Sequence, residues 1–86
     1  MKNINVFVYN NSKLVYDKKW KMDYSVEGIY EFMGGNKDMI DLLGEGVEVE
    51  WDVKKYVSKK GDVWSFRFKL DDSDFMMRFV DRSVKI

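Results

Sequence analysis

Hydrophobic and polar residues alternate most regularly between residues 47 and 70, and this period of two predicts a β-hairpin with one buried face. The apolar positions of its two arms are Val47, Val49, Trp51, Val53, Val57, Trp64, Phe66, Phe68 and Leu70. A two-residue turn at Lys60-Gly61, or a four-residue loop over residues 59–62, would place Val57 opposite Trp64 and Val53 opposite Phe68. The other face would carry Glu48, Glu50, Asp52, Lys54, Tyr56, Arg67 and Lys69, and we expect it to be solvated.

Two further strands are predicted near the N-terminus. Residues 4–9 are rich in the β-branched and aromatic types that are enriched in strands. The turn at residues 10–12 contains two asparagines, which tolerate the left-handed backbone that tight hairpins require. From Leu14 to Tyr24 the even positions are apolar except for Lys18, whose stem we expect to lie along the edge of the core.

Helical spacing follows in the middle of the chain. A short helix is predicted over residues 26–33, with Asp23 or Ser25 as its N-cap and Gly34-Gly35 as its end. Its apolar face contains Val26, Ile29, Tyr30 and Met33. Asn36 can cap a second short helix that carries Met39, Ile40 and Leu43 and ends at Gly44, and one kinked helix is the alternative.

The C-terminal segment fits two secondary structures. The acidic run over residues 71–74 is typical of a helix N-terminus, and it is followed by Phe75, Met76, Phe79 and Val80 at helical spacing. We therefore predict a helix at residues 73–82. The alternative is a strand over residues 77–86, in which Met77 and Phe79 alternate with Arg78.

These elements predict an α+β fold. We expect one small domain over residues 1–86, with a four-stranded antiparallel sheet in ββα-ββα order and short helices on one face. The predicted core consists of Val6, Val8, Trp20, Met22, Ile29, Val49, Trp51, Val53, Phe66, Phe68, Phe75 and Phe79. This interpretation requires Trp51 and Phe68 to lie on the same face of the sheet.

The composition limits the chemistry that the chain can perform. It contains no cysteine, which fits a reducing compartment, and we expect a cytoplasmic protein without disulfides. It contains no histidine, so the usual general base and the commonest metal ligand are missing. No apolar run approaches the roughly 20 residues of a membrane span. We expect no cofactor and no metal site, and we expect a protein that is not an enzyme.

Charge is distributed unevenly although its sum is zero. Fifteen basic residues balance fifteen acidic ones, yet residues 23–52 hold nine acids and a single lysine. An acidic face of this kind can imitate a nucleic-acid backbone and occupy a basic groove of a nucleic-acid-processing enzyme. The expected function is therefore that of a protein-binding inhibitor or modulator. The predicted partner-binding residues are Asp38, Asp41, Glu48, Glu50 and Asp52.

Two other classes of function compete with this hypothesis. Basic and aromatic residues interleave at residues 18–21, 54–56, 59–60 and 67–69, as in proteins that bind single-stranded nucleic acid. Direct binding to nucleic acid ranks below a protein partner because the net charge is zero. A self-associating structural subunit is a further alternative, since the sequence does not determine the oligomeric state.

A metal-dependent enzyme ranks last among the alternatives. Glu48, Glu50, Asp52 and Lys54 alternate on one strand face, and carboxylates of this kind can hold a hard cation. A catalytic site would need a further acid from another element, and the sequence indicates none. The small size and the lysine and asparagine content resemble accessory proteins of AT-rich phages and mobile elements, a likeness of composition alone.

Overall fold

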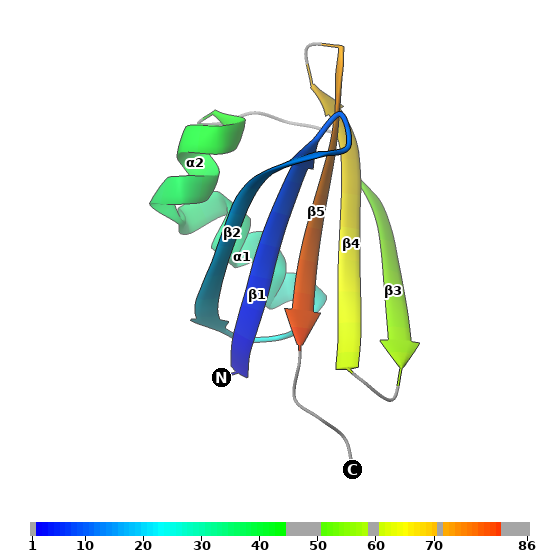
Figure 1. Ribbon diagram of the computed structural model, residues 1–86. Helices are drawn as coiled ribbons and strands as arrows, with labels where there is room; N and C mark the ends of the chain where they lie inside the picture. The colour runs from blue at the N-terminus through cyan, green and yellow to red at the C-terminus, as the bar shows by residue number, and fades with distance from the viewer. Residues whose placement is uncertain (1, 45–50, 59–60, 71, 82–86) are drawn as a thin grey trace.

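The computed structural model describes residues 2–44, 51–58, 61–70 and 72–81 (Figure 1). The elements in chain order are β1 Lys2–Asn10, β2 Lys13–Met22, α1 Val26–Gly35, α2 Lys37–Leu43, β3 Asp52–Ser58, β4 Gly61–Leu70 and β5 Ser73–Asp81. The strands form a five-stranded antiparallel sheet in the order β2-β1-β5-β4-β3. The helices lie on one face of the sheet: in Figure 1, α1 passes behind β1 and β2, and α2 lies at the left beside β2. The α+β class is confirmed, whereas the four-stranded ββα-ββα order is wrong.

The error lies in the last element, which is a strand and not a helix. β5 occupies the centre of the sheet, where it pairs with β1 on one side and with β4 on the other. Both of its backbone edges are therefore hydrogen-bonded. A helix over the same residues would leave the facing backbone groups of β1 and β4 without these partners. Met77 and Phe79 face the core, whereas Met76 and Val80 face the opposite side of the sheet. Apolar residues on both faces produced the apparent helical spacing.

The chain forms a hairpin between β4 and β5 where a helix N-terminus was predicted. Leu70 pairs with Ser73, and Asp72 has a φ of 63°, so the chain reverses here and begins no helix. The predicted turn between β1 and β2 is confirmed, because Asn10 pairs with Lys13 and both Asn11 and Ser12 have positive φ. Short polar residues that tolerate the left-handed region thus form both of these turns.

The central hairpin forms, but its register differs from the predicted one. Val53 lies opposite Phe66 and Lys55 opposite Trp64, each two positions away from the expected pairing. A shift of two residues leaves every side chain on its predicted face, so the hydrophobic pattern alone cannot exclude it. In the observed register the Lys55 Nζ lies 5.3 Å from the centroid of the Trp64 ring, a cation–π contact.

The helix boundaries follow from side-chain caps. The Ser25 hydroxyl accepts a hydrogen bond from the Gly28 N–H, which confirms Ser25 as the N-cap of α1. The Asn36 side chain accepts from the N–H groups of Asp38 and Met39, and Gly44 ends α2 with a φ of 88°. Two capped helices therefore replace the alternative of one kinked helix.

The core lies between the helices and the sheet and is largely the predicted one. Its buried side chains are Ile4, Val6, Val8, Met22, Ile29, Met33, Met39, Phe66, Phe68, Met77 and Phe79. Four expected members, Trp20, Trp51, Val53 and Phe75, are partly buried against this cluster, and Val49 lies outside the described residues. The rings of Trp51 and Phe68 lie 4.7 Å apart, which confirms that these residues share a face.

Two glycines of α1 should respond oppositely to alanine. A Cβ at Gly28 would overlap the carbonyl oxygen of Asp23, whereas a Cβ at Gly34 would meet no atom within 4 Å. We expect Gly28→Ala to lower the free energy of unfolding by about 1–3 kcal/mol or more. We expect Gly34→Ala to raise it by about 0.5–1 kcal/mol, because alanine favours the helix. Urea unfolding of both variants measures the difference, and equal effects would contradict the described approach of α1 to Asp23.

Candidate functional site

One face of the sheet is not covered by α1 and α2, and we call it the open face (Figure 1). The strand pairings place its side chains in rows across all five strands. One row contains Lys19, Asn5, Val80, Val63 and Tyr56, the next Asp17, Phe7, Arg78, Ser65 and Lys54, and the third Leu14, Tyr9, Met76, Arg67 and Asp52. The open face is therefore a mixture of apolar, aromatic and charged side chains, and not a solvated polar surface.

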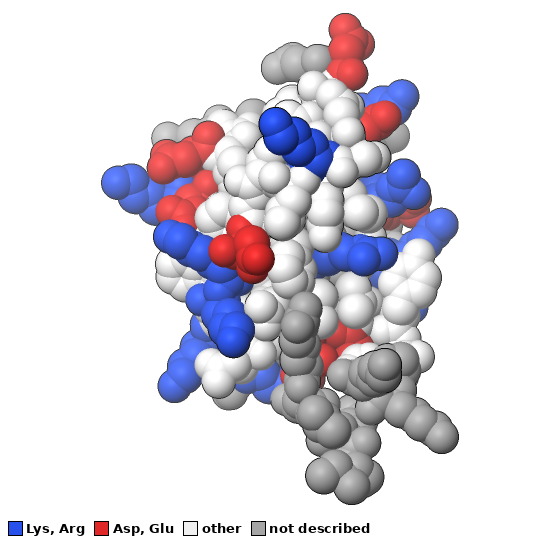
Figure 2. Space-filling view, viewed as in Figure 1, with Lys and Arg blue, Asp and Glu red and all other residues white. Residues whose placement is uncertain are grey.

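Apolar side chains occupy the middle of the open face. Phe7 and Tyr9 of β1 lie beside Met76 and Val80 of β5, and all four are partly exposed. Tyr56 lies on the edge strand β3 with 53% of its surface exposed. Figure 2 shows an uncharged band along the middle of this face, with basic and acidic side chains on both sides. Aromatic rings that reach the surface of a sheet can stack on planar ligand groups.

Basic side chains outnumber acidic ones on the open face. The exposed basic residues are Lys19, Lys21, Lys54, Arg67, Lys69 and Arg78, and the exposed acidic residues are Asp17, Asp52 and Asp74. Lys69 and Asp74 form an ion pair with an N–O distance of 3.8 Å. Arg78 lies on the central strand, directly between Phe7 and Ser65. The open face therefore carries a local positive excess.

The helix layer has the opposite charge. Its exposed or half-buried acids are Asp23, Glu27, Glu31, Asp38 and Asp41, and Lys37 is its basic residue. The uneven charge of the sequence thus becomes a division between the two layers of the molecule. The zero net charge of the chain conceals a basic sheet face and an acidic helix layer.

The predicted acidic surface is divided by this arrangement. Asp38 and Asp41 belong to α2. The Asp38 carboxylate accepts a hydrogen bond from Tyr16 on the edge strand β2. Asp52 begins β3, the edge strand on the other side of the sheet. Glu48 and Glu50 lie outside the described residues. The described members of the set therefore do not form one continuous surface.

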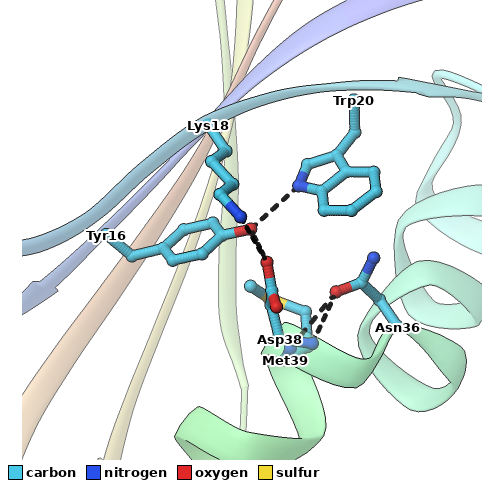
Figure 3. Close-up of polar contacts among 6 residues, drawn as sticks. All are labelled: Tyr16, Lys18, Trp20, Asn36, Asp38 and Met39. Carbon is cyan, nitrogen blue, oxygen red and sulfur yellow. Dashed lines mark hydrogen bonds and ion pairs between the residues drawn. The ribbon is translucent and has the colours of Figure 1, made fainter.

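Asp38 is also engaged in a polar cluster with residues of β2 (Figure 3). The Tyr16 hydroxyl donates a hydrogen bond of 2.7 Å to the Asp38 carboxylate and accepts one of 2.9 Å from the Trp20 indole N–H. The Lys18 Nζ lies 3.3 Å from the same carboxylate oxygen. The Lys18 side chain is exposed, and its ammonium group pairs with Asp38 at the surface. This cluster holds α2 against the edge of the sheet, so Asp38 is more than an exposed charge.

The cluster changes the pKa of two of its members. Desolvation by burial, together with the hydrogen bond to Asp38, raises the pKa of Tyr16 to about 12. The hydrogen bond from Tyr16, followed by that from Lys18, lowers the pKa of Asp38 below its ordinary value of 3.8. Both shifts favour the neutral phenol and the ionised carboxylate at neutral pH. The interaction is therefore intact over the whole neutral range.

A pH dependence of stability follows from the lowered pKa of Asp38. A carboxyl whose pKa is lower in the folded state stabilises that state above its unfolded pKa, and the stabilisation disappears as the pH falls through the folded pKa. We expect wild type to lose this contribution below about pH 4, near the ordinary value of 3.8. The urea midpoint of unfolding, measured from pH 7 to pH 2.5, should therefore fall less steeply with decreasing pH in Asp38→Asn than in wild type. The exposed Asp41→Asn is the matched control, and identical profiles for the two variants would contradict the prediction.

A second charged contact lies between β1 and β5. The Lys2 Nζ lies 2.9 Å from a carboxylate oxygen of Asp81, whose side chain is only 2% exposed. The hydrogen bond and the charge of Asp81 raise the pKa of Lys2. The nearby Tyr24 hydroxyl contacts the carbonyl oxygens of Asp62 and Phe79, at 2.8 and 3.0 Å. These contacts satisfy buried polar groups and have a structural role.

Part of the open face could be predicted from the sequence. Period-two alternation assigns Lys19, Lys54 and Arg67 to the side opposite the core, and the structure confirms this assignment. Lys18, Trp20 and Lys55 from the same basic-aromatic segments lie on the helix side, and residues 59–60 lie outside the described part. The predicted helix at residues 73–82 concealed Arg78 and Met76. The strand alternative over residues 77–86 would have placed Arg78 opposite the core, but it did not include Met76.

Comparisons with known proteins give no functional assignment. A scan against family models, a search of curated proteins and a search of solved structures found no match to this chain. Within residues 2–44, 51–58, 61–70 and 72–81, no group of three acidic residues is placed to hold a metal ion. None of the helices in the described part is long and apolar enough to cross a membrane. The function must therefore be inferred from the surfaces.

Proposed function

We propose that the protein is a non-enzymatic module that binds single-stranded nucleic acid on the open face. The observation that carries this proposal is the combination of Tyr9 and Tyr56 with a positive excess around Arg78. Proteins that bind single strands combine a basic track for the phosphates with aromatic rings on which bases stack. A binding role is favoured over catalysis because the chain has neither histidine nor cysteine.

The zero net charge does not oppose this proposal once the charges are divided between two layers. The acids of the helix layer are separated from the open face by the sheet and by helices about 10 Å in diameter. The Debye length is about 8 Å at physiological ionic strength, so exposed charges at greater separation are largely screened. A phosphate at the open face therefore interacts mainly with the charges of that face, where six exposed basic residues outnumber the exposed acids Asp17, Asp52 and Asp74.

Shape favours single strands over duplex. The major groove of duplex DNA admits a helix or a two-stranded ribbon, and a broad five-stranded face cannot enter it. Tyr9 and Tyr56 are separated by three strand spacings, which corresponds to about 14 Å across the sheet. A nucleic-acid strand lying diagonally between the two rings would pass over Arg78 and Ser65, and Arg67 lies one row to the side of Ser65. Unpaired bases are available for stacking along such a path, whereas paired bases are not.

Binding of a labelled oligonucleotide tests the proposal. Fluorescence anisotropy with mixed-sequence DNA and RNA of about 12 nucleotides, within the usual site size, should show binding that weakens as salt rises. The slope of log K against log salt should be about −0.7 for each phosphate neutralised. A duplex of the same length should bind more weakly. The proposal fails if no salt-sensitive binding occurs at low salt, or if the duplex binds equally well.

The helix layer supports a second candidate function. Glu27, Glu31 and Asp41 are exposed together with half-buried Asp38 on the acidic side of the molecule. An acidic surface of this kind fits a protein partner with a basic groove, such as a nucleic-acid-processing enzyme. The full set Asp38, Asp41, Glu48, Glu50 and Asp52 remains a prediction. Partner affinity of Glu48→Lys/Glu50→Lys at two salt concentrations tests it, and unchanged affinity would remove those two residues from the surface.

A further inference from the structure

The two edges of the sheet differ in how they are protected from pairing. The edge strand β2 contains a break in register opposite Val8 and Tyr9, whereas lysines occur on both edge strands, including Lys54 and Lys55 of β3. Bulges and lysines are the usual devices that prevent an exposed edge from pairing with another chain. The other edge strand, β3, pairs with β4 without a shift in register along residues 52–58. Its outer edge has no partner strand within the described part of the chain.

β3 also exposes apolar side chains on both of its faces. Val57 is 68% exposed and Tyr56 53% exposed, the highest values among the large apolar residues of the described ranges. Val57 lies on the helix side and Tyr56 on the open face, so both surfaces of this edge are apolar at the same point. A regular edge with apolar side chains is a template for strand addition.

We propose that β3 pairs in antiparallel orientation with β3 of a second copy of this chain. Such a pair is related by a two-fold axis, as in most homodimers. With Lys55 on the axis, residue 52 pairs with 58 and all seven residues of β3 find a partner. Val53 then lies opposite Val57, and Lys54 opposite Tyr56, twice each. Both contacts are favourable cross-strand pairs, one apolar and one cation–π.

The unfavourable element of this register is the pair of Lys55 residues on the axis, since like charges directly opposite destabilise a sheet. The structure relieves this repulsion. The Lys55 Nζ lies over the ring of Trp64 on β4, so the ammonium group extends inward along its own sheet and away from the outer edge. The contact with Trp64 also keeps the Lys55 side chain away from the outer backbone edge of β3. The two Lys55 side chains therefore do not prevent self-pairing of β3.

The dimer would join two five-stranded sheets into one and make the two open faces continuous. This inference does not depend on the proposed function, because the oligomeric state is measured without nucleic acid. The two proposals share Lys54 and Tyr56, which belong to the open face and to the edge strand β3. A strand pair of seven residues is a small interface, so a weak dimer that dissociates on dilution is expected.

Sedimentation of the full chain over micromolar to millimolar concentrations tests the inference. Wild type should change from monomer to dimer, and Val57→Lys should remain monomeric, because it places a charge at each end of the strand pair. Val15→Lys is the matched control on β2, where Val15 is also exposed, and it should dimerise as wild type does. Thermal unfolding of both variants should match wild type. A monomer at all concentrations, or a dimer that Val57→Lys leaves unchanged, would overturn the proposal.

Cross-linking tests the register. The chain has no cysteine, so Lys55→Cys introduces a single thiol on the proposed axis. Directly opposite residues have Cα atoms about 4.5–5.5 Å apart, which is within the range of a disulfide. Under mild oxidation this variant should form a covalent dimer faster than Val15→Cys. Equal rates for the two variants would exclude the proposed pairing.

Discussion

Met77→Ala is expected to lower the free energy of unfolding by about 2–5 kcal/mol, whereas Met76→Ala should cost less than about 1.5 kcal/mol. Met77 is completely buried on the core side of β5, and its neighbour Met76 is partly exposed on the open face. Truncation of a buried side chain destabilises the folded state in two ways: the transfer free energy of the removed atoms is lost, and a cavity remains. A partly exposed side chain loses only a fraction of either contribution.

This pair of variants decides how the C-terminal segment is folded. In a helix over residues 73–82, Met76 would share the apolar stripe with Phe75 and Phe79, and Met77 would lie off that stripe. The strand β5 reverses these positions, because Met77 and Phe79 face the core together. Urea unfolding followed by tryptophan fluorescence measures both variants under the same conditions. A larger loss for Met76→Ala than for Met77→Ala would contradict the strand.

The largest expected effect on binding comes from reversing the charge at the centre of the open face. Arg78→Glu should weaken binding of a single-stranded 12-mer at least tenfold at low salt. A charge-assisted hydrogen bond contributes about 1.5–3 kcal/mol, and about 1.4 kcal/mol corresponds to a factor of ten. The slope of log K against log salt should also become less steep by about 0.7 or more, because a phosphate contact is lost. Arg78 is exposed, so the fold should be retained.

Two further variants separate the open face from a general effect of charge. Lys37→Glu makes the same charge change in the helix layer and should alter affinity little. Tyr9→Ala removes a ring without changing charge, and it should weaken binding by about 1–3 kcal/mol while leaving the salt slope unchanged. Equal losses for Arg78→Glu and Lys37→Glu would show that binding depends on net charge and not on this face.

Local patterns in the sequence determined most of the individual elements. Alternation identified β2, β3 and β4, and β-branched and aromatic composition identified β1. Side-chain capping predicted α1 and α2 from Ser25, Asn36 and Gly44. These features depend on residues close together in the chain, so they are visible in the sequence. The same alternation assigned Lys54, Tyr56 and Arg67 to the face opposite the core. The part of the open face on β3 and β4 was therefore predictable.

Only the tertiary structure decided the identity of β5, the register of the central hairpin and the relation between charged surfaces. Residues 75–80 fit either period, and pairing with both β1 and β4 selects the strand because it satisfies two backbone edges at once. The register differs by two residues, a change that no pattern of period two can detect. Asp38 and Asp52 belong to the same acidic segment of the sequence, residues 23–52. In the structure Asp38 contacts the edge strand β2, whereas Asp52 lies on β3 at the opposite edge of the sheet. Strand order is a long-range property, and it decides which side chains become neighbours.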